Sequence, residues 1–424
     1  MPHTFEIPLD LPDVTIKTAK MSQMGHIQLT IQSTIEGTPC HQCDQITTTF
    51  YDQDREIVFR HLPILGRKTY IHLRPQRYQC LTCPGGPTTT QQLSWYTPRS
   101  ASTEAYEEQI LFSLVNSTVS DVSIKEDIGY EAVMGIINRH LDQSVDWSRF
   151  TRLDVLGLDE ISLKKGHQDF VAIATARVEG QTLILGVLPD REKATVKQFL
   201  QSIPRHLRQT IHSVCCDMYD GFVNAAIEVL GKRVKVVNDR FHVAKLYRSG
   251  LDKLRKQELT RLKAVLSDDE YSQLKGAMWA LRKREENLSD HDGEILTCLF
   301  EYSPKLELAY DLCDDLTTLF DSPISKRKGK NKLKKWMERV RSSDLSCFDS
   351  FLKTLEKRLD TIANYFIDRH TSGFVEGFNN KIKVIKRRCY GILNVTHLFQ
   401  RIQLDLYGYA LFAPKLLSFR PLWE

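Results

Sequence analysis

The sequence lacks any long run of apolar residues. No stretch approaches the roughly 18 consecutive apolar residues typical of a membrane-spanning helix. No N-terminal stretch combines positive charge with a long apolar segment, as a secretory signal does. Both absences predict a cytoplasmic protein with no membrane partner. Internal repeats and low-complexity linkers are also absent. The length of 424 residues allows about three globular domains.

Charge of one sign is not in large excess either. The 58 basic and 53 acidic residues leave a net charge of +5, which is too small to identify a polyanionic ligand by itself. Ten cysteines are present, and in a reducing compartment we do not expect them to form a disulfide framework. The positions of charges and cysteines are therefore more informative than their totals.

Four of the cysteines form two Cys-x-x-Cys pairs within the first 95 residues. Cys40 and Cys43 make one pair, and Cys80 and Cys83 make the other. The segments around them alternate apolar and polar residues, which predicts short β-strands. Two such pairs at the tips of β-turns are typical of a tetrahedral zinc site with four thiolate ligands. We therefore predict a zinc-binding, β-rich module over residues 1–95, with reduced core thiols as the alternative.

Helical periodicity follows, over residues 96–148. The stretch 120–139 reads as a helix, a turn that contains Gly129, and a second helix. This is the layout of a helix-turn-helix, in which the second helix reads DNA. On that interpretation Tyr130, Asn138 and Arg139 are available to DNA. Two short helices around a glycine also occur where helices simply pack, so the pattern alone leaves both interpretations open.

Strands and helices alternate from about residue 149 to residue 245. Three apolar segments, 154–158, 169–176 and 182–188, are joined by short turns that favour antiparallel pairing. Two further strands, 213–216 and 234–237, are each reached through a helix. This order predicts a mixed sheet with helices on its faces, as in an RNase H-like fold. The first and fourth strands are neighbours in that fold, so Asp159 and Asp217 are expected to meet at one edge of the sheet.

A third carboxylate, Glu376, lies far downstream on a predicted helix. Residues at i+4, i+7 and i+11 from Phe378 continue an apolar stripe along this helix. The same spacings from Glu376 give a polar stripe, which consists of Asn380, Lys383 and Arg387. The two stripes are about 200° apart, so one packs on the sheet and the other faces outward. Two aspartates and one glutamate can hold a pair of divalent ions for phosphoryl chemistry, and their oxygen ligands favour Mg²⁺ or Mn²⁺.

Between the second and third carboxylates, residues 246–367 are almost entirely helical in pattern. They contain a basic run at 326–335. Such a run can bind a phosphate backbone, and a solvated helix surface explains it equally well. After this insertion we expect the catalytic core to resume over residues 368–424, with Glu376 and the C-terminal helices.

Together these pieces resemble the DDE transposases of the ISL-three family of bacterial insertion sequences. The resemblance rests on four motifs, which are Leu158-Asp159-Glu160, Cys216-Asp217-Met218-Tyr219, Asp239-Arg240-Phe241-His242-Val243 and the segment 375–383. The cysteine pairs and the helix-turn-helix match as well. The resemblance implies a multidomain α+β protein whose RNase H-like core holds Asp159, Asp217 and Glu376 as a metal-binding triad. It assigns Asp239 and His242 a supporting role.

The resemblance also implies a reaction and its partners. The reaction is Mg²⁺-dependent cleavage of double-stranded DNA at the element's terminal inverted repeats, followed by attack of the freed 3′-OH on target DNA. The zinc and helix-turn-helix modules are expected to recognise the repeats, while Asn380, Lys383 and Arg387 contact DNA and steady the scissile strand. Joining two ends requires a dimer or larger assembly on DNA, at the nucleoid of a bacterial cell.

Two other functions fit the same residues. One is a structure-specific nuclease of RNase H-like fold that cuts without joining. The other is a zinc and helix-turn-helix regulator without catalysis, which predicts that the three carboxylates are scattered in space. A decayed transposase is not indicated, because all three acids and both cysteine pairs are present.

Overall fold

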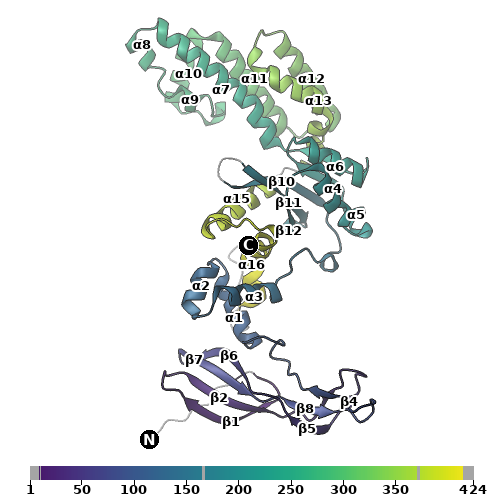
Figure 1. Ribbon diagram of the computed structural model, residues 1–424. Coiled ribbons are helices and arrows are strands. Elements are labelled where there is room, and N and C mark those ends of the chain that lie inside the picture. The colour runs from purple at the N-terminus through teal and green to yellow at the C-terminus, as the bar shows by residue number, and fades with distance from the viewer. Residues whose placement is uncertain (1–8, 10, 165–167, 370–372, 414–424) are drawn as a thin grey trace. The chain divides into compact units, whose positions relative to one another are not determined.

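The computed structural model describes residues 9, 11–164, 168–369 and 373–413, with the backbone alone described at residues 164, 168, 169 and 374–376. The chain divides into two compact units. One consists of Met1–Leu141 with Gln403–Glu424, and the other of Asp142–Ile402. Each combines strands with helices, so the fold is mixed α/β, and Figure 1 labels the elements for which there is room. Across the described residues, every helix is either too short or too polar to traverse a lipid bilayer.

The first unit begins with three small sheets. The largest contains, in order, β1 (Val14–Met21), β2 (Ile27–Ser33), β7 (Arg67–Leu73) and β6 (Ile57–Ile64). The others pair β3 (Thr38–Pro39) with β4 (Ile46–Thr47), and place β8 (Gln76–Gln79) between β5 (Thr49–Gln53) and β9 (Thr88–Thr90). Alternate residues of a strand share a face, and in the largest sheet the apolar ones bury against Trp95 and Tyr96.

Helices α1 (Glu104–Leu114), α2 (Val119–Glu126) and α3 (Tyr130–His140) complete the first unit. Thr118 caps α2 by accepting a hydrogen bond from the N–H of Asp121, and α2 ends at Asp127 in a left-handed conformation. The three helices share an apolar core with Leu404, from the C-terminal part of α16 (Val395–Phe412). The end of the chain therefore stabilises these helices.

The second unit is built on a five-stranded sheet. Its order is β12 (Gln181–Leu188), β11 (Gln168–Val178), β10 (Val155–Lys164), β13 (Ser213–Cys216) and β14 (Lys235–Asn238). The first three strands along the chain pair antiparallel, and β13 and β14 run parallel to β10. A short 3-10 turn at Trp147–Arg149 precedes β10. Helices α4 (Lys193–Ser202) and α5 (Arg205–Thr210) connect β12 to β13, and α6 (Asp220–Leu230) connects β13 to β14.

Strand β10 is longer than the sequence predicted. The apolar segment 154–158 suggested a strand that stops before Asp159, but β10 continues to Lys164. Its pairing with β11 runs from Val155 opposite Arg177 to Lys164 opposite Gln168, whereas its pairing with β13 stops at Leu158. Asp159 therefore marks the end of the parallel pairing and lies in the middle of the strand itself.

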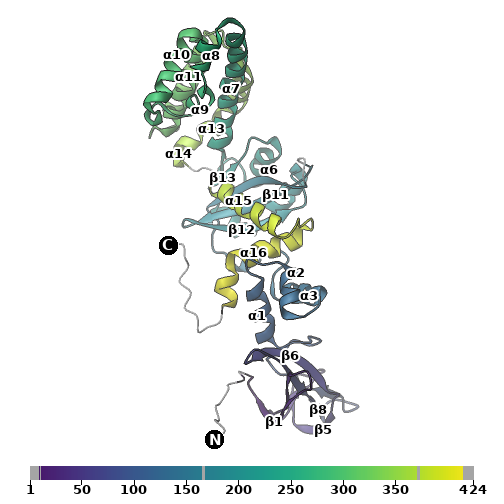
Figure 2. The same ribbon diagram turned by 90° about the vertical axis from the view of Figure 1, so that its left-hand side faces the viewer.

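A large helical region follows β14 in the chain and packs against one face of the sheet. Its helices are α7 (Arg240–Val265), α8 (Asp268–Ser272), α9 (Ala277–Ala280), α10 (Asp290–Tyr302), α11 (Pro304–Asp321), α12 (Lys326–Arg341), α13 (Asp349–Ala363) and α14 (Tyr365–Asp368), with 3-10 turns at Glu285–Asn287 and Ser346–Phe348. Cys215 and Val237 of the sheet share one core with Tyr247 and Leu251 of α7. Helix α15 (Gly373–Arg388) then returns to the sheet and contacts β10 and β12 (Figure 2).

Candidate functional site

The register of the parallel strands places three aspartates side by side, directly after the last paired row of the sheet. Leu158 pairs with Cys216 across β10 and β13, and Cys216 pairs with Asn238 across β13 and β14. Asp159, Asp217 and Asp239 are the residues that directly follow this row. The N–H of Asp239 also bonds to the carbonyl of Cys216 at 3.0 Å. Three positions that are far apart in the sequence are therefore neighbours at the end of the parallel strands.

Asp159 is the most constrained of these carboxylates. Its Oδ2 accepts a hydrogen bond from Nδ2 of Asn379 at 2.6 Å, and its Oδ1 accepts one from the N–H of Glu160 at 2.8 Å. Burial raises the pKa of Asp159 to about 6, and the negative charges of Asp217 and Asp239 act in the same direction. A nearby cation would stabilise the ionised form of this carboxylate and so lower its pKa.

Asp217 is held in a similar way. Its Oδ1 accepts a hydrogen bond from the N–H of Tyr219 at 2.9 Å, and its backbone carbonyl accepts one from Nδ2 of Asn238 at 3.0 Å. Burial raises the pKa of Asp217, and the charge of Glu160 raises it further. Two partly buried carboxyls with raised pKa values, offering only oxygen ligands, are a donor set that suits Mg²⁺ or Mn²⁺.

Asp239 and His242 occupy the first turn of α7. Asp239 is almost fully buried and caps the helix, because its Oδ1 accepts a hydrogen bond from the N–H of Phe241 at 3.2 Å. His242 Nε2 lies 3.9 Å from Asp239 Oδ2, and its ring also interacts electrostatically with Asp159 and Asp217. Both residues that we assigned a supporting role therefore border the carboxylates.

Helix α15 carries the third predicted carboxylate. The side chain of Glu376 lies outside the described residues, although position 376 belongs to the helix. One turn later Asn379, with 3% of its surface exposed, donates to Asp159 and has no hydrogen-bond partner for its Oδ1 among the described residues. The contact with Asp159 was not predicted from the sequence. The i+3 spacing from Glu376 was the available signal, since residues three apart share one side of a helix.

The two stripes of α15 lie as their periodicity predicted. Phe378, Ile382 and Ile385 are buried, whereas the polar stripe is exposed at Asn380, Lys383 and Arg387. Between them Lys386 donates to the backbone carbonyls of Ser162 and Leu163 in β10. This lysine fastens the helix to the sheet and leaves the outward cations accessible.

A second contact that the sequence did not reveal joins Glu160 and Arg191. Arg191 Nη1 lies 2.5 Å from Glu160 Oε2, and the guanidinium stands over the rings of Phe170 and Tyr219 at 4.6 and 5.0 Å from their centroids. Tyr219 is bonded to Asp217, so a cation stands next to the carboxylates. Neither residue has a recognisable spacing relative to the other in the sequence.

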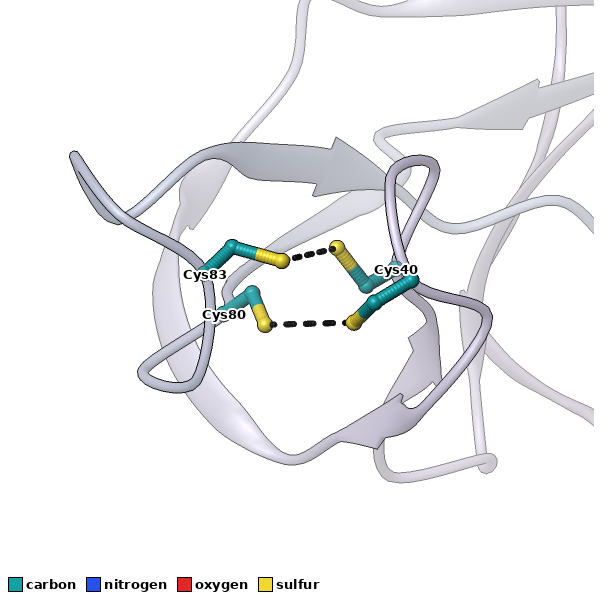
Figure 3. A group of neighbouring side chains, drawn as sticks. Cys40, Cys80 and Cys83 are labelled. Carbon is teal, nitrogen blue, oxygen red and sulfur yellow. Dashed lines mark hydrogen bonds between the residues drawn. The ribbon is translucent and has the colours of Figure 1, made fainter.

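The four predicted thiolate ligands are brought together in the first unit. Cys40 and Cys43 lie in the turn between β3 and β4, and Cys80 and Cys83 in the turn between β8 and β9 (Figure 3). The Cys40 and Cys83 sulfurs are 4.0 Å apart, those of Cys43 and Cys80 are 3.8 Å apart, and all four lie within 4.8 Å of one another. Four sulfurs at about 2.3 Å from one tetrahedral zinc ion are about 3.8 Å apart, so the geometry fits zinc.

The protonation of these thiols also fits a bound cation. Backbone N–H groups of Cys83 and Thr82 lower the pKa of Cys80 to about 6, whereas contact with Cys43 raises the pKa of Cys83 to about 12. The backbone therefore stabilises the thiolate of Cys80, whereas ionisation of Cys83 needs an added positive charge.

The predicted DNA-reading helix corresponds to α3. Tyr130 and Asn138 are exposed on it. Arg139 also has an exposed part, but it donates to Glu107 of α1 with its Nε at 3.2 Å and its Nη2 at 2.6 Å. His140 lies 2.7 Å from the same carboxylate, which has only 1% of its side chain exposed. Arg139 thus holds α3 against α1, a role that its place in the sequence did not suggest.

The chain matches known proteins over most of its length. A family model described as transposase, of the ISL3 type, covers residues 156–402, and a second, the zinc finger of transposases IS204, IS1001, IS1096 and IS1165, covers residues 36–83. The chain is 27% identical over 374 residues to the transposase for insertion sequence element IS1001 of Bordetella parapertussis, covering 88% of this chain and 89% of that protein. It is 22% identical over 349 residues to the transposase for IS1557 of Mycobacterium tuberculosis, covering 78% and 77%.

Proposed function

Since this chain belongs to the ISL-three (ISL3) family of DDE transposases, we propose that Asp159, Asp217 and Glu376 form the centre at which it cleaves and joins DNA. The observation that carries this proposal is the hydrogen bond between Asn379 and Asp159 at 2.6 Å. It fixes α15 against the central strand, and position 376 lies one turn before Asn379 on the same side of that helix. This spacing supports a position for the third acid near the other two.

The sheet supports an RNase H-like core. Three antiparallel strands, followed by two strands parallel to the first, give the order β12-β11-β10-β13-β14, which is the order that the sequence suggested for this fold. Helices α7 to α14 then form the insertion between the second and third acids. We keep the divisions proposed from the sequence, at residues 95, 148, 245 and 367, as part of this proposal.

The carboxylates would hold Mg²⁺ or Mn²⁺. Such ions, when bound, activate the attacking oxygen and stabilise the leaving oxygen of a phosphodiester. Asn379 orients Asp159, and the N–H of Tyr219 orients Asp217. Asp239 and His242 close the centre at the start of α7, while Asn380, Lys383 and Arg387 offer an exposed polar row for the scissile strand.

The first unit is the proposed reader of the element's ends. The four cysteines and the match to a transposase zinc finger support a structural zinc ion there. Helices α2 and α3, with the turn at Asp127 between them, suit a helix-turn-helix. We assign Tyr130 and Asn138 to the DNA-facing side of α3. Arg139 is assigned to DNA only if binding releases it from Glu107.

A donor plasmid that carries the element with its own flanking DNA tests the function. Purified protein with Mg²⁺ should release the element and join its ends to a target plasmid, and Asp159→Asn should do neither. Asp268→Asn, an exposed change in α8, is the matched control and should retain both steps. Cutting without joining would indicate a nuclease, and products from Asp159→Asn would refute the catalytic assignment. Because two ends are joined, we also expect a dimer or larger assembly on DNA.

A further inference from the structure

A cavity of about 700 Å³ lies between α7 and the segment around α9, apart from the carboxylates. Its apolar lining includes Leu251, Met278 and Leu281. Its cationic lining consists of Lys245, Arg248, Arg255 and Arg282. A cavity that combines apolar side chains with several cations is suited to a ligand that is anionic and partly apolar.

The positive charges in this cavity are only partly neutralised. Asp252 is the sole carboxylate among the described lining residues, and it contacts Arg255 at 2.8 Å and Arg282 at 4.0 Å. Arg248 donates to the backbone carbonyl of Arg282 at 3.0 Å and makes no ion pair among the described residues. Lys245 is exposed, with no ion-pair or hydrogen-bond partner in the part of the chain that the structure describes. The excess favours phosphate groups.

Two exposed aromatic rings contribute to or adjoin the lining of this cavity. Phe241 lines it, with 52% of its surface exposed. Trp279 is 61% exposed and is not a lining residue, but the guanidinium of Arg282, which does line the cavity, lies 5.4 Å from its ring centroid. Rings of this size are normally covered in a folded core. Exposed aromatic rings next to cations are the combination that stacks unpaired bases and holds their phosphates.

The cavity lies along the same helix as the catalytic machinery. Asp239 caps helix α7, and Phe241 and His242 are adjacent in its first turn with ring centroids 5.7 Å apart. Lining residues then continue to Arg255, which is about 20 Å further along the helix axis. A strand that leaves the carboxylates at His242 therefore meets Phe241 and Lys245 next.

We propose that this cavity binds unpaired nucleotides of the DNA strand that is cut or released at the carboxylate centre. The inference rests on the function proposed above and adds a substrate site to it. A volume of about 700 Å³ is in the range of small-ligand pockets, so it accommodates one or two nucleotides and excludes a duplex. The duplex must open next to the scissile phosphate for the site to be filled.

Binding of a single strand to the full-length protein tests the site. The probe is a fluorescein-labelled oligo(dT) 12-mer, followed by fluorescence anisotropy over a range of salt concentrations. Phe241→Ala should weaken binding about tenfold, since it removes a stacking platform. Lys245→Ala should lower the salt dependence by about 0.7 in log–log slope. Lys253→Ala, an exposed lysine of α7 outside the cavity, should leave both quantities unchanged.

The location is tested by cross-linking. An oligonucleotide that contains 5-iododeoxyuridine should cross-link to peptides of α7 or α9 in the wild type and less efficiently in Phe241→Ala. Wild-type affinity in both Phe241→Ala and Lys245→Ala, or cross-links confined to other segments, would overturn the inference while leaving the cleavage results intact. Conversely, Asp159→Asn should bind the oligonucleotide normally, so failure of the proposed catalysis is distinguishable from failure of this site.

Discussion

Asn379 is the residue that ties helix α15 to the carboxylate centre. Its amide donates to Asp159 from a position that is 3% exposed. Partners that orient a metal ligand typically contribute 10- to 100-fold to metal affinity or activity. We therefore expect Asn379→Ala to lower DNA cleavage by about that factor and to weaken Mn²⁺ binding to the free protein, measured by electron paramagnetic resonance.

Asn380 offers a matched control for this prediction. It is the next residue of the same helix and is exposed, so Asn380→Ala should leave Mn²⁺ affinity of the free protein unchanged. An unaltered Mn²⁺ affinity in Asn379→Ala would mean that the hydrogen bond only supports the fold of α15.

Glu107 is a buried carboxylate with an internal role in the first unit. Burial raises its pKa, but hydrogen bonds from His140, Arg139, Ser100 and Ser102 outweigh that effect and lower the pKa to about 2. A lowered pKa in the folded state stabilises the protein at pH values above the ordinary pKa of 4.5, which the group has in the unfolded chain. The contribution is lost as the pH falls towards 2 and amounts to at most about 3 kcal/mol.

Glu107→Gln removes the charge whose ionisation stabilises the folded protein at neutral pH. The variant should be less stable than the wild type near neutral pH, and the difference in free energy of unfolding should shrink as the pH falls from about 5 to 2. Chemical denaturation at several pH values measures it. Glu108→Gln, which changes the exposed neighbour in α1, should show no such pH-dependent difference. A constant difference for Glu107→Gln would contradict the role of its charge.

Helix α12 shows how packing directs a basic run outward. Gly329 is buried against Phe366, where an added Cβ would lie 2.3 Å from a ring carbon, and Leu333 and Trp336 are buried beside it. The sequence left open whether this run binds phosphates or is a solvated surface. The packing leaves Lys328, Lys332 and Lys335 exposed on one side of the helix.

We expect this side of α12 to bind the DNA backbone. Replacing Lys328, Lys332 and Lys335 with Gln should reduce the slope of log affinity against log salt by about 0.9 for each phosphate that is no longer neutralised. Filter binding of duplex DNA at several salt concentrations measures the slope. As the control, Lys326→Gln with Lys330→Gln alters lysines that already bind Asp360 at 3.0 and 3.1 Å. Equal slopes in the two variants would refute a specific role for the exposed side.

Elements whose pattern is local were predictable from the sequence, and their partners were not. The buried and exposed stripes of α15 follow directly from helical periodicity, and strand Ser213–Cys216 follows from a short apolar run. By contrast, the extension of β10 beyond Leu158 depends on β11 as its partner. The bond from Asn379 to Asp159 and the pair of Arg139 with Glu107 depend on tertiary packing in the same way.

The first unit contains residues from two distant parts of the chain, Met1–Leu141 and Gln403–Glu424. Leu404 joins the core of α1 to α3, and the N–H of Asn116 donates to Asp405 at 3.0 Å. Nothing in the local sequence of α16 indicates this partner, because an apolar stripe does not specify what covers it. The unit that holds the cysteines is therefore closed by residues from both ends of the chain.

The two units should respond differently to the loss of zinc. The small sheets around the cysteines have short strands, and metal binding supplies much of the folding free energy in such segments. The second unit has its own extensive cores, and the only thiol cluster suited to a metal in the described residues is in the first unit. Cys43→Ser should therefore lower one thermal transition and expose residues 36–90 to protease, while a fragment near 142–402 persists. Cys298→Ser, in α10, should change neither; a joint shift of all transitions in Cys43→Ser would show that the units unfold together.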